Sequence, residues 1–421
     1  MVKIGFDKQC ITPKLPVALS GYAGKRIAAG VHDELYVRCI AMECSGELYL
    51  LAQCDCLAVD DVLRNAVLTR LNEPHLSDAH FVLMATHTHS GPAGTIDTSQ
   101  KPFTGLTDVF GVSDPAYQKE LSEKITLAAH NAFSDLMECQ LTVGRGSIEN
   151  VGTERHDASL PGDSSLLVLR FDRCDGKQVL LYNYACHPTV LNPSNLLITA
   201  DLPYAVERGF AYDMVMFVNS NAGDISTRFT RKSSSYEQVE SYSHVIIEEI
   251  RKALEQPVYQ GAFWQIDIQQ YPIVLPIKKV PPVETAQAQL QKYEADLEKG
   301  KQQGLEAKEL RILASYVEGA SVAVGLSKTL KDLDYIDAHF SIITLQELKI
   351  AVIPGELFST LGTILKREGI EVFGYGNGYY MYLADKNAYD SMYYEAMSSP
   401  FERGVGEYMI REILDKAKGC S

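Results

Sequence analysis

Two histidines separated by one residue, His87 and His89, lie in the segment THTHSGPAG, directly after the apolar run HFVLMA. Side chains two residues apart in an extended segment point to the same side, so both imidazoles can face one pocket. Neutral imidazole is a strong ligand for a borderline-soft cation such as Zn²⁺. The pair indicates a metal site, although a loop without function explains such a pair equally well on its own.

Three more polar clusters follow strand-like apolar runs elsewhere in the chain. His187 follows VLLYNYA, the segment SNAGDIS follows MVMFVN, and Glu356 follows KIAVIPG. Loops at strand ends are where α/β proteins build their sites, so we expect the four clusters to share one rim. Alone, His187 could be a core histidine and Glu356 a carboxylate at a helix N-terminus. The prediction of one shared site rests on the position of all four clusters directly after strand-like runs.

The segment GDIS places the Asp224 carboxylate and the Ser226 hydroxyl next to each other in a tight turn. A hydroxyl in such a turn suits a nucleophile or a hydrogen-bond donor to an oxyanion. A simple Asx turn explains the same residues equally well. The chain has no G-x-S-x-G elbow, which argues against the serine triad of the α/β-hydrolases.

An α/β fold with a mixed β-sheet core flanked by helices is expected to position these clusters. Up to about residue 275, short β-rich runs alternate with helical stretches, which is typical of an α/β domain. The pattern predicts strands at residues 36–42, 48–53, 80–85, 166–171, 179–185, 214–218 and 263–268, and helices at residues 60–71, 115–133, 202–212 and 236–254.

Residues 281–330 are rich in Ala, Glu, Gln, Lys and Leu, which predicts a helical insertion of two helices joined by a turn near Gly300 and Gly304. A solvated face, a lid and a dimer arm remain open as its role. Residues 340–345 and 349–353 are predicted to form a hairpin that returns to the sheet. Residues 1–421 are interpreted as a single catalytic domain, and no internal repeat is evident.

The charge balance of the chain limits its partners. With 39 basic and 54 acidic residues the formal net charge is -15, and no basic run could follow a phosphate backbone, which argues against nucleic acid. No apolar segment reaches the roughly 20 residues of a membrane-spanning helix. The N-terminus lacks the features of a secretory signal, so we expect a cytoplasmic protein. The oligomeric state is left open.

Five ordered segments resemble those of the neutral/alkaline non-lysosomal ceramidases: THTHSGPAG, ACHPTVL with the later TADLP, NAGDIS, IPGELFSTLG and NGYYMYLADKNAYDSMYYEA. The resemblance runs from GFDKQCITP to about residue 400. It implies the catalytic domain of a zinc amidase that acts on N-acyl sphingosines. By motif, the resemblance implies that the zinc ligands are His87, His187, Glu356 and Tyr382.

The resemblance also implies a catalytic group on the substrate side of the metal. It consists of His89, Ser226 and Tyr394, with Arg155 of ENVGTERH as the candidate for the arginine of the family, although the local pattern there differs. Zinc would polarise the amide carbonyl and lower the pKa of a water toward ~7. Ser226 and His89 would hydrogen-bond the oxyanion or the departing amine.

The chain departs from the family pattern directly after Ser226. Where ceramidases continue with Pro-Asn, this sequence has Thr227-Arg228, which places a cation beside the reaction centre. Arg228 and Asp224 are therefore candidate substrate-binding residues, and the substrate could be anionic or polar. We expect no counterpart of the immunoglobulin-like C-terminal domain of the larger ceramidases.

The sequence thus predicts a zinc-dependent hydrolase that cleaves the amide bond of a small-molecule or lipid-like N-acyl substrate, with Ser226 assisting. A metal-dependent hydrolase of an ester, a lactone or a phosphate-bearing small molecule is a second interpretation, because water activation does not determine which bond is cleaved. A zinc-binding sensor without catalysis is a third.

Overall fold

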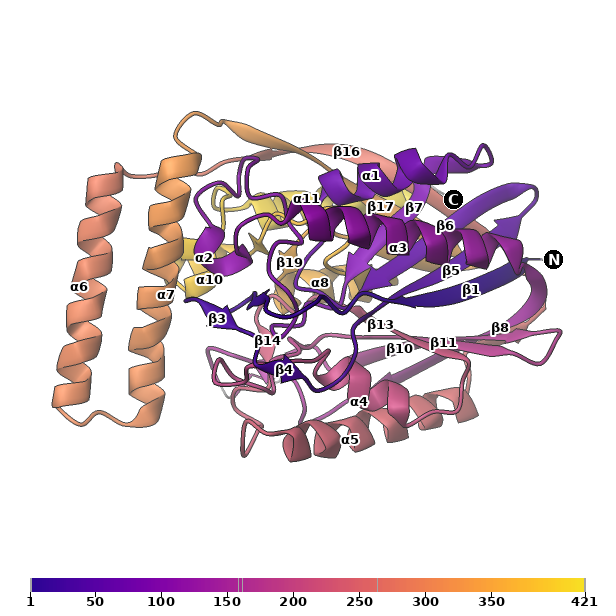
Figure 1. The fold of residues 1–421 in the computed structure, drawn as a ribbon, viewed down its shortest axis with the longest axis horizontal. Helices are drawn as coiled ribbons and strands as arrows, with labels where there is room; N and C mark the ends of the chain where they lie inside the picture. Colours follow the sequence, from indigo (N-terminus) through magenta and orange to yellow (C-terminus); the bar gives the residue numbers. More distant parts are fainter. Residues whose placement is uncertain (1, 158, 161, 263, 420–421) are drawn as a thin grey trace.

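The computed structural model describes residues 2–157, 159–160, 162–262 and 264–419. Its two larger β-sheets share an apolar core, to which the first sheet contributes Val82 and Leu169 and the second Ile343 and Val352. Helices cover the outer sides (Figure 1). The predicted mixed sheet flanked by helices is confirmed.

The larger sheet has nine strands in the described part of the chain, eight of them in the order β13-β11-β10-β8-β1-β5-β6-β7, with β15 paired to β8. Pairs β6/β7 and β11/β13 are parallel, and the other pairs are antiparallel. The strands are β1 (Lys3–Cys10), β5 (Tyr36–Cys44), β6 (Glu47–Cys54), β7 (Leu76–Ala85), β8 (Met137–Ser147), β10 (Ser165–Arg173), β11 (Gln178–Tyr184), β13 (Met214–Asn219) and β15 (Tyr259–Gly261).

The smaller sheet has the order β16-β17-β18-β20. It is formed by β16 (Ile266–Pro276), β17 (Tyr335–Leu345), β18 (Leu348–Val352) and β20 (Ile370–Phe373). Strands β17 and β18 form the predicted hairpin. The strand expected at residues 263–268 begins at Phe263, which lies outside the described residues, and the observed strand continues well past residue 268.

One arrangement of elements recurs along the chain. It consists of antiparallel neighbours, a helix, and a last strand that pairs in parallel with the strand before the helix: β1-β5-β6-α1-β7, β8-β10-β11-α4-β13 and β16-β17-β18-α8-β20. The helices are α1 (Asp61–Leu71), α4 (Leu202–Arg208) and α8 (Ser359–Arg367). Because the paired strands are parallel, their carboxyl ends lie side by side, and the polar clusters begin at these ends.

Amphipathic helices complete the outer layers. Helix α3 (Pro115–Ser134) lies with α1 against one half of the larger sheet, and α5 (Tyr236–Glu255) lies with α4 against the other half. Helix α5 buries Val239, Ile246 and Ile250 on one face, and the Ser235 side chain caps it by accepting from the Gln238 N–H. Helix α11 (Val405–Gly419) packs with α8 over the smaller sheet.

The predicted insertion is a pair of antiparallel helices, α6 (Val283–Gln302) and α7 (Ala307–Thr329), which stands at one side of the molecule (Figure 1). Helix α7 contacts α10 (Tyr394–Ser398), and α6 packs against α7. The shorter elements are β2 (Ala18–Leu19), β3 (Arg26–Ile27), β4 (Gly30–Val31), β9 (Thr153–Glu154), β12 (Leu197–Ile198), β14 (Ile225–Ser226), β19 (Glu356–Leu357), β21 (Tyr382–Leu383), α2 (Thr107–Phe110) and α9 (Lys386–Asp390). None of the helices in the described ranges has the length and apolar character needed to cross a bilayer.

Candidate metal centre

Three side chains from distant segments meet at the strand ends. His87 follows β7, His187 follows β11, and Glu356 begins β19 shortly after β18. The Glu356 Oε2 atom lies 3.0 Å from His187 Nε2 and 3.4 Å from His87 Nε2. All three side chains are at least 97 % buried. The structure therefore brings together three of the four ligands that the motifs imply.

Backbone carbonyl groups orient the two imidazoles. His87 Nδ1 lies 2.8 Å from the Leu57 carbonyl oxygen, and His187 Nδ1 lies 3.0 Å from that of Ile225. A nitrogen that faces a carbonyl must carry the proton of the neutral ring, which assigns the lone pair to Nε2. The backbone of His87 adopts a left-handed conformation, with φ of 69°. The geometry therefore directs both lone pairs toward Glu356.

Glu356 Oε2 and the Nε2 atoms of His87 and His187 are all hydrogen-bond acceptors in this arrangement, and none of them carries a proton to donate to the others. Two imidazole lone pairs and a carboxylate oxygen repel one another unless a proton or a cation lies among them. Burial lowers the pKa of His187 to about 4, which disfavours a proton on this ring at neutral pH. His89 adds a third imidazole, whose Nε2 lies 3.2 Å from His87 Nε2. One ring nitrogen from each histidine falls within 4.8 Å of the others, and this donor set fits a zinc ion.

Two tyrosines lie beside this cluster. The Tyr379 hydroxyl donates to Glu356 Oε1, and the Tyr382 hydroxyl accepts from Arg155 Nη2 at 3.2 Å. The parallel pairing of β19 with β21 places Tyr382 next to Glu356. Burial, followed by the charge of Glu356, holds the pKa of Tyr382 well above its usual range. A phenolate at this position therefore requires a cation close by.

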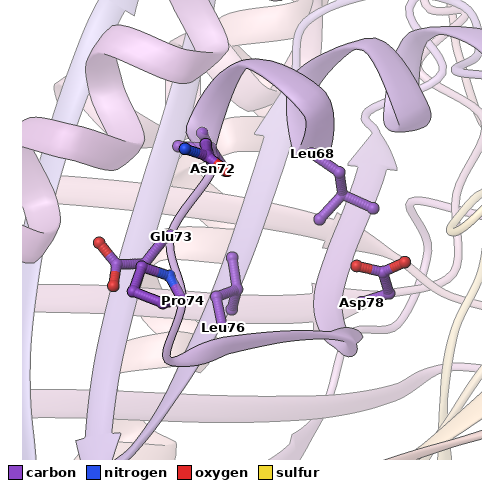
Figure 2. A pocket seen from close by; sticks show the side chains of 7 residues that line it. Leu68, Asn72, Glu73, Pro74, Leu76 and Asp78 are labelled. Carbon is purple, nitrogen blue, oxygen red and sulfur yellow. The ribbon is translucent and has the colours of Figure 1, made fainter.

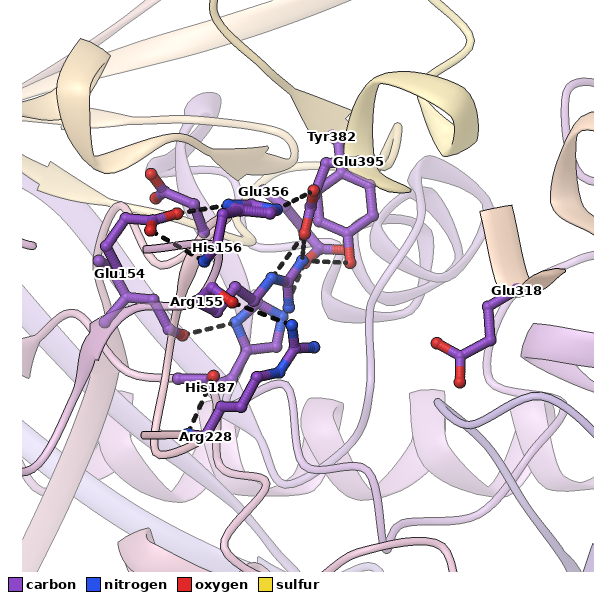
Figure 3. Close-up of polar contacts among 12 residues, drawn as sticks. Glu154, Arg155, His156, His187, Arg228, Glu318, Glu356, Tyr382 and Glu395 are labelled. Carbon is purple, nitrogen blue, oxygen red and sulfur yellow. Dashed lines mark hydrogen bonds and ion pairs between the residues drawn. The ribbon is translucent and has the colours of Figure 1, made fainter. Parts of the chain in front are cut away.

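Arg155 is held in a buried network of charges (Figure 3). Its Nε donates to Glu395 Oε1 at 2.6 Å, and the other oxygen of Glu395 contacts His156 Nε2 at 2.7 Å. His156 also contacts Glu154 and stacks on Tyr393 with ring centroids 3.9 Å apart. Burial alone would lower the pKa of His156, but Glu395 and Glu154 raise it to about 9. Two carboxylates therefore face two cations, and Arg155 is fixed against Tyr382.

The other predicted residues lie around this core in different ways. Ser226 is buried in β14, and its Oγ accepts from the Arg228 backbone N–H at 3.3 Å. The Tyr394 ring meets the Tyr382 ring edge-on, with centroids 5.7 Å apart. The Asp224 carboxylate accepts from the Ser359 N–H at 2.7 Å and from its hydroxyl at 2.9 Å. These contacts tie the turn of Asp224 to the start of α8.

The sequence profile of the family described as "Neutral/alkaline non-lysosomal ceramidase, N-terminal" matches residues 3–239. The chain belongs to this ceramidase family. The neutral ceramidases of Drosophila melanogaster and Drosophila pseudoobscura pseudoobscura are each 23% identical over 256 residues, which is 53% of this chain and 36% of each relative. The match thus spans about a third of the length of these curated relatives. The resemblance predicted from the motifs is confirmed.

Solved ceramidase structures share the fold. The crystal structure of neutral ceramidase from Pseudomonas aeruginosa superposes with a TM-score of 0.74 at 17% identity, over 98% of this chain and 73% of that chain. The structure titled "Ceramidase complexed with C2" gives 0.72 at 15% identity, over 97% and 74%. The ceramidase profile ends before Glu356, Tyr382 and Tyr394, so motif order and geometry carry the assignment of these residues.

Sequence reasoning did not name several side chains that contact the candidate ligands or Arg155, directly or through one another: Tyr379, Glu395, His156 and Glu154. Each lies within three residues of a residue that the motifs named, but nothing in the sequence showed that their side chains turn inward.

A surface hollow of about 460 Å³ lies elsewhere, between the end of α1 and the start of β7 (Figure 2). His87 follows the other end of β7, so this hollow is separate from the histidine cluster.

Proposed function

We propose that this chain is a zinc-dependent amidase of N-acyl substrates and that His87, His187, Glu356 and Tyr382 hold the metal. One observation carries the proposal: two imidazole lone pairs converge on a buried carboxylate oxygen, with separations of 3.0 and 3.4 Å. This cluster of acceptors needs a cation, and imidazole and carboxylate are ligands that zinc prefers.

When bound, zinc supplies a Lewis acid that polarises a carbonyl group and a nucleophile that forms near neutral pH. The residues of the chain provide the rest of the chemistry. The Ser226 Oγ already accepts an N–H, so its own proton is free to be donated to an oxyanion. His89 Nδ1 has no hydrogen-bond partner among the described residues, and burial lowers the pKa of His89 well below its usual range. The ring is therefore neutral and is available to hydrogen-bond the oxyanion or the departing amine.

Arg155 and Tyr394 complete the proposed group on the substrate side. The Arg155 guanidinium donates to the Tyr382 hydroxyl, which favours a phenolate there. Tyr394 lies edge-on against Tyr382, and we assign its ring to the wall of the proposed substrate site. Because Asp224 is engaged by Ser359, we assign it a positioning role for the turn that carries Ser226.

Elemental analysis and a matched pair of substrates test this function. The purified chain should contain about one zinc per molecule and should release fatty acid from short N-acyl amines and from ceramide. Chelation should abolish turnover, and added zinc should restore it. The Ser226→Ala variant should turn over amides more slowly with its zinc retained. A protein that carries no metal, or one that binds zinc but leaves every amide intact, would contradict the proposal.

Hydrolysis of an ester, a lactone or a phosphate-bearing small molecule by the same metal is a second candidate, because the guanidinium of Arg228 donates to the carbonyl oxygen of Arg155, another residue of the proposed site. An N-acyl amine and an O-acyl ester with the same acyl chain separate the two functions. Amide inertness with rapid ester cleavage would favour this candidate.

The single catalytic domain over residues 1–421 and the cytoplasmic location stay predictions.

A further inference from the structure

Arg228 is a half-buried cation next to Ser226. Its Nη1 donates to the Arg155 carbonyl oxygen at 3.0 Å, and its backbone N–H donates to Ser226 Oγ. No carboxylate in the described ranges forms an ion pair with its guanidinium. In the part of the chain that the structure describes, no nitrogen of its guanidinium is buried without a partner, so the nitrogens that form no hydrogen bond are accessible to an anion.

The acidic side chains near Arg228 are already engaged. Glu395 is bound by Arg155 and His156. Glu318 of α7 accepts from both terminal nitrogens of Arg311, at 2.7 and 3.2 Å. Figure 3 shows Glu318 across from Arg228, with no contact drawn between them. Neither of these carboxylates is therefore free to neutralise Arg228.

Two further arginines bind the loops that carry the histidines. Arg26 Nη2 donates to the His89 carbonyl oxygen at 2.8 Å, and Arg231 Nη1 donates to that of Thr189, two residues after His187, at 2.6 Å. Neither forms an ion pair within the part of the chain that the structure describes. Arg26, Arg228 and Arg231 thus place three guanidinium groups without a carboxylate partner, among the described residues, around the loops of the site, in a chain whose net charge is -15.

We propose that the site takes N-acyl substrates with an anionic group, a carboxylate, sulfonate or phosphate, within a few bonds of the scissile amide, and that Arg228 binds this group. The inference rests on the proposed amidase function and adds the substrate class. The side chain of Arg228 makes one hydrogen bond among the described residues, which leaves donors for the anion. Guanidinium binds such anions through charge-assisted, often bidentate hydrogen bonds.

Matched substrates test the inference on each side of the amide. On the amine side, N-hexanoyltaurine is compared with N-hexanoylethanolamine, and on the acyl side, N-glutarylethylamine is compared with N-pentanoylethylamine. We expect the anionic member of at least one pair to have a kcat/KM about tenfold higher or more, mainly through a lower KM. The Arg228→Gln variant should lower this preference about tenfold, and Arg228→Lys should keep part of it.

Charge reversal sharpens the test. On the side of the amide where the wild type prefers the anion, Arg228→Glu should prefer a cationic analogue over the anionic one, which on the amine side means N-hexanoylethylenediamine over N-hexanoyltaurine. Arg208→Gln is the matched control, because Arg208 is 56% exposed and pairs with Glu240 on the surface. This control should keep the wild-type preference. Zinc content and circular dichroism of each variant report whether the fold is retained.

A binding measurement separates substrate choice from turnover. In calorimetry, the Ser226→Ala variant should bind the anionic member of the pair in which the wild type prefers the anion about tenfold more tightly than the neutral member, and adding Arg228→Gln should remove the difference. Equal kcat/KM values within both substrate pairs would overturn the inference and leave the amidase proposal standing. Failure to cleave any of the amides would overturn the proposed function, and the inference would fail with it.

Discussion

The imidazoles of His87 and His187 are aimed by the backbone, because each Nδ1 is bound to a main-chain carbonyl oxygen. This arrangement fixes the tautomer and the ring orientation without a side chain that must itself be positioned. Glu356 is in turn held by Tyr379 through its other carboxylate oxygen. The candidate ligands are therefore set in place before any metal binds, which favours affinity.

Substitutions at these residues separate metal binding from chemistry. His187→Ala and Glu356→Gln should each weaken zinc binding about 100-fold or more, because they remove a ligand from a buried site. Ser226→Ala should retain zinc and lower kcat by about 10²-fold, as expected for loss of one oxyanion donor. Zinc is measured by mass spectrometry after dialysis, with His244→Ala, an exposed histidine on α5, as the control. Full zinc retention in both ligand variants would refute the assignment.

His156 should make stability depend on pH above neutrality. Its pKa rises from an ordinary 6.5 to about 9 in the folded chain, so its stabilisation is fully present below pH 6.5 and is lost as the pH rises through about 9. The shift corresponds to at most about 3 kcal/mol. Urea unfolding at pH 6 and pH 9.5 should show this loss in the wild type and a smaller loss in His156→Gln.

The control for His156 is His244→Gln, which replaces an exposed histidine on α5 and should follow the wild type at both values of pH. An equal change of unfolding midpoint with pH in His156→Gln and the wild type would contradict the role of the charge network around Glu395.

At the scale of elements, the site depends on close approaches between loops. Gly223 donates its N–H to the Leu357 carbonyl oxygen, and a methyl group added at Gly223 would lie 2.6 Å from the Glu356 carbonyl oxygen. The absence of a side chain therefore lets the turn of Asp224 lie directly against β19. The recurring unit of strands and helix brings these loops close together, because the carboxyl ends of its parallel strands lie side by side.

The Gly223→Ala variant should disturb Glu356 without replacing a ligand. Overpacking at such a contact costs about 1–3 kcal/mol, and the neighbour that must yield is backbone. We expect weaker zinc binding and a lower thermal midpoint. Gly419→Ala is the control, since a methyl group there meets no atom within 4 Å. Wild-type zinc affinity in Gly223→Ala would show that β19 can move without affecting the site.

Sequence patterns predicted the elements with strong periodicity and missed those set by pairing. The hydrophobic spacing in α5 and the apolar runs of β11 and β13 were sufficient to predict these three elements. The motifs named His87, His187 and Glu356, whose side chains the structure brings together. Strands β1 and β8 were missed, because polar residues in KIGFDKQC and two glycines in MECQLTVGRGS obscure the pattern. The recurring unit was also missed, because its connections differ in length and only the pairing reveals it.

At the scale of the whole molecule, stability should be distributed unevenly. The two larger sheets share one core and are covered on their outer sides by helices, so their backbone is shielded from water. The pair of helices α6 and α7 stands apart from these layers (Figure 1). Among the described residues, α6 buries Ala286 and Gly300, whereas β6 buries most of its side chains.

Hydrogen–deuterium exchange should reveal this difference directly. Protection reflects the free energy of the opening that exposes an amide, and a helix with few buried apolar contacts opens without disrupting the core. We expect amides of α6 to exchange at least about 100-fold faster than those of β6, with α7 between them because it contacts α10. Protection of α6 equal to that of β6 at low protein concentration would contradict this order. Protection that appears only at high concentration would instead show that α6 is covered by a second copy of the chain.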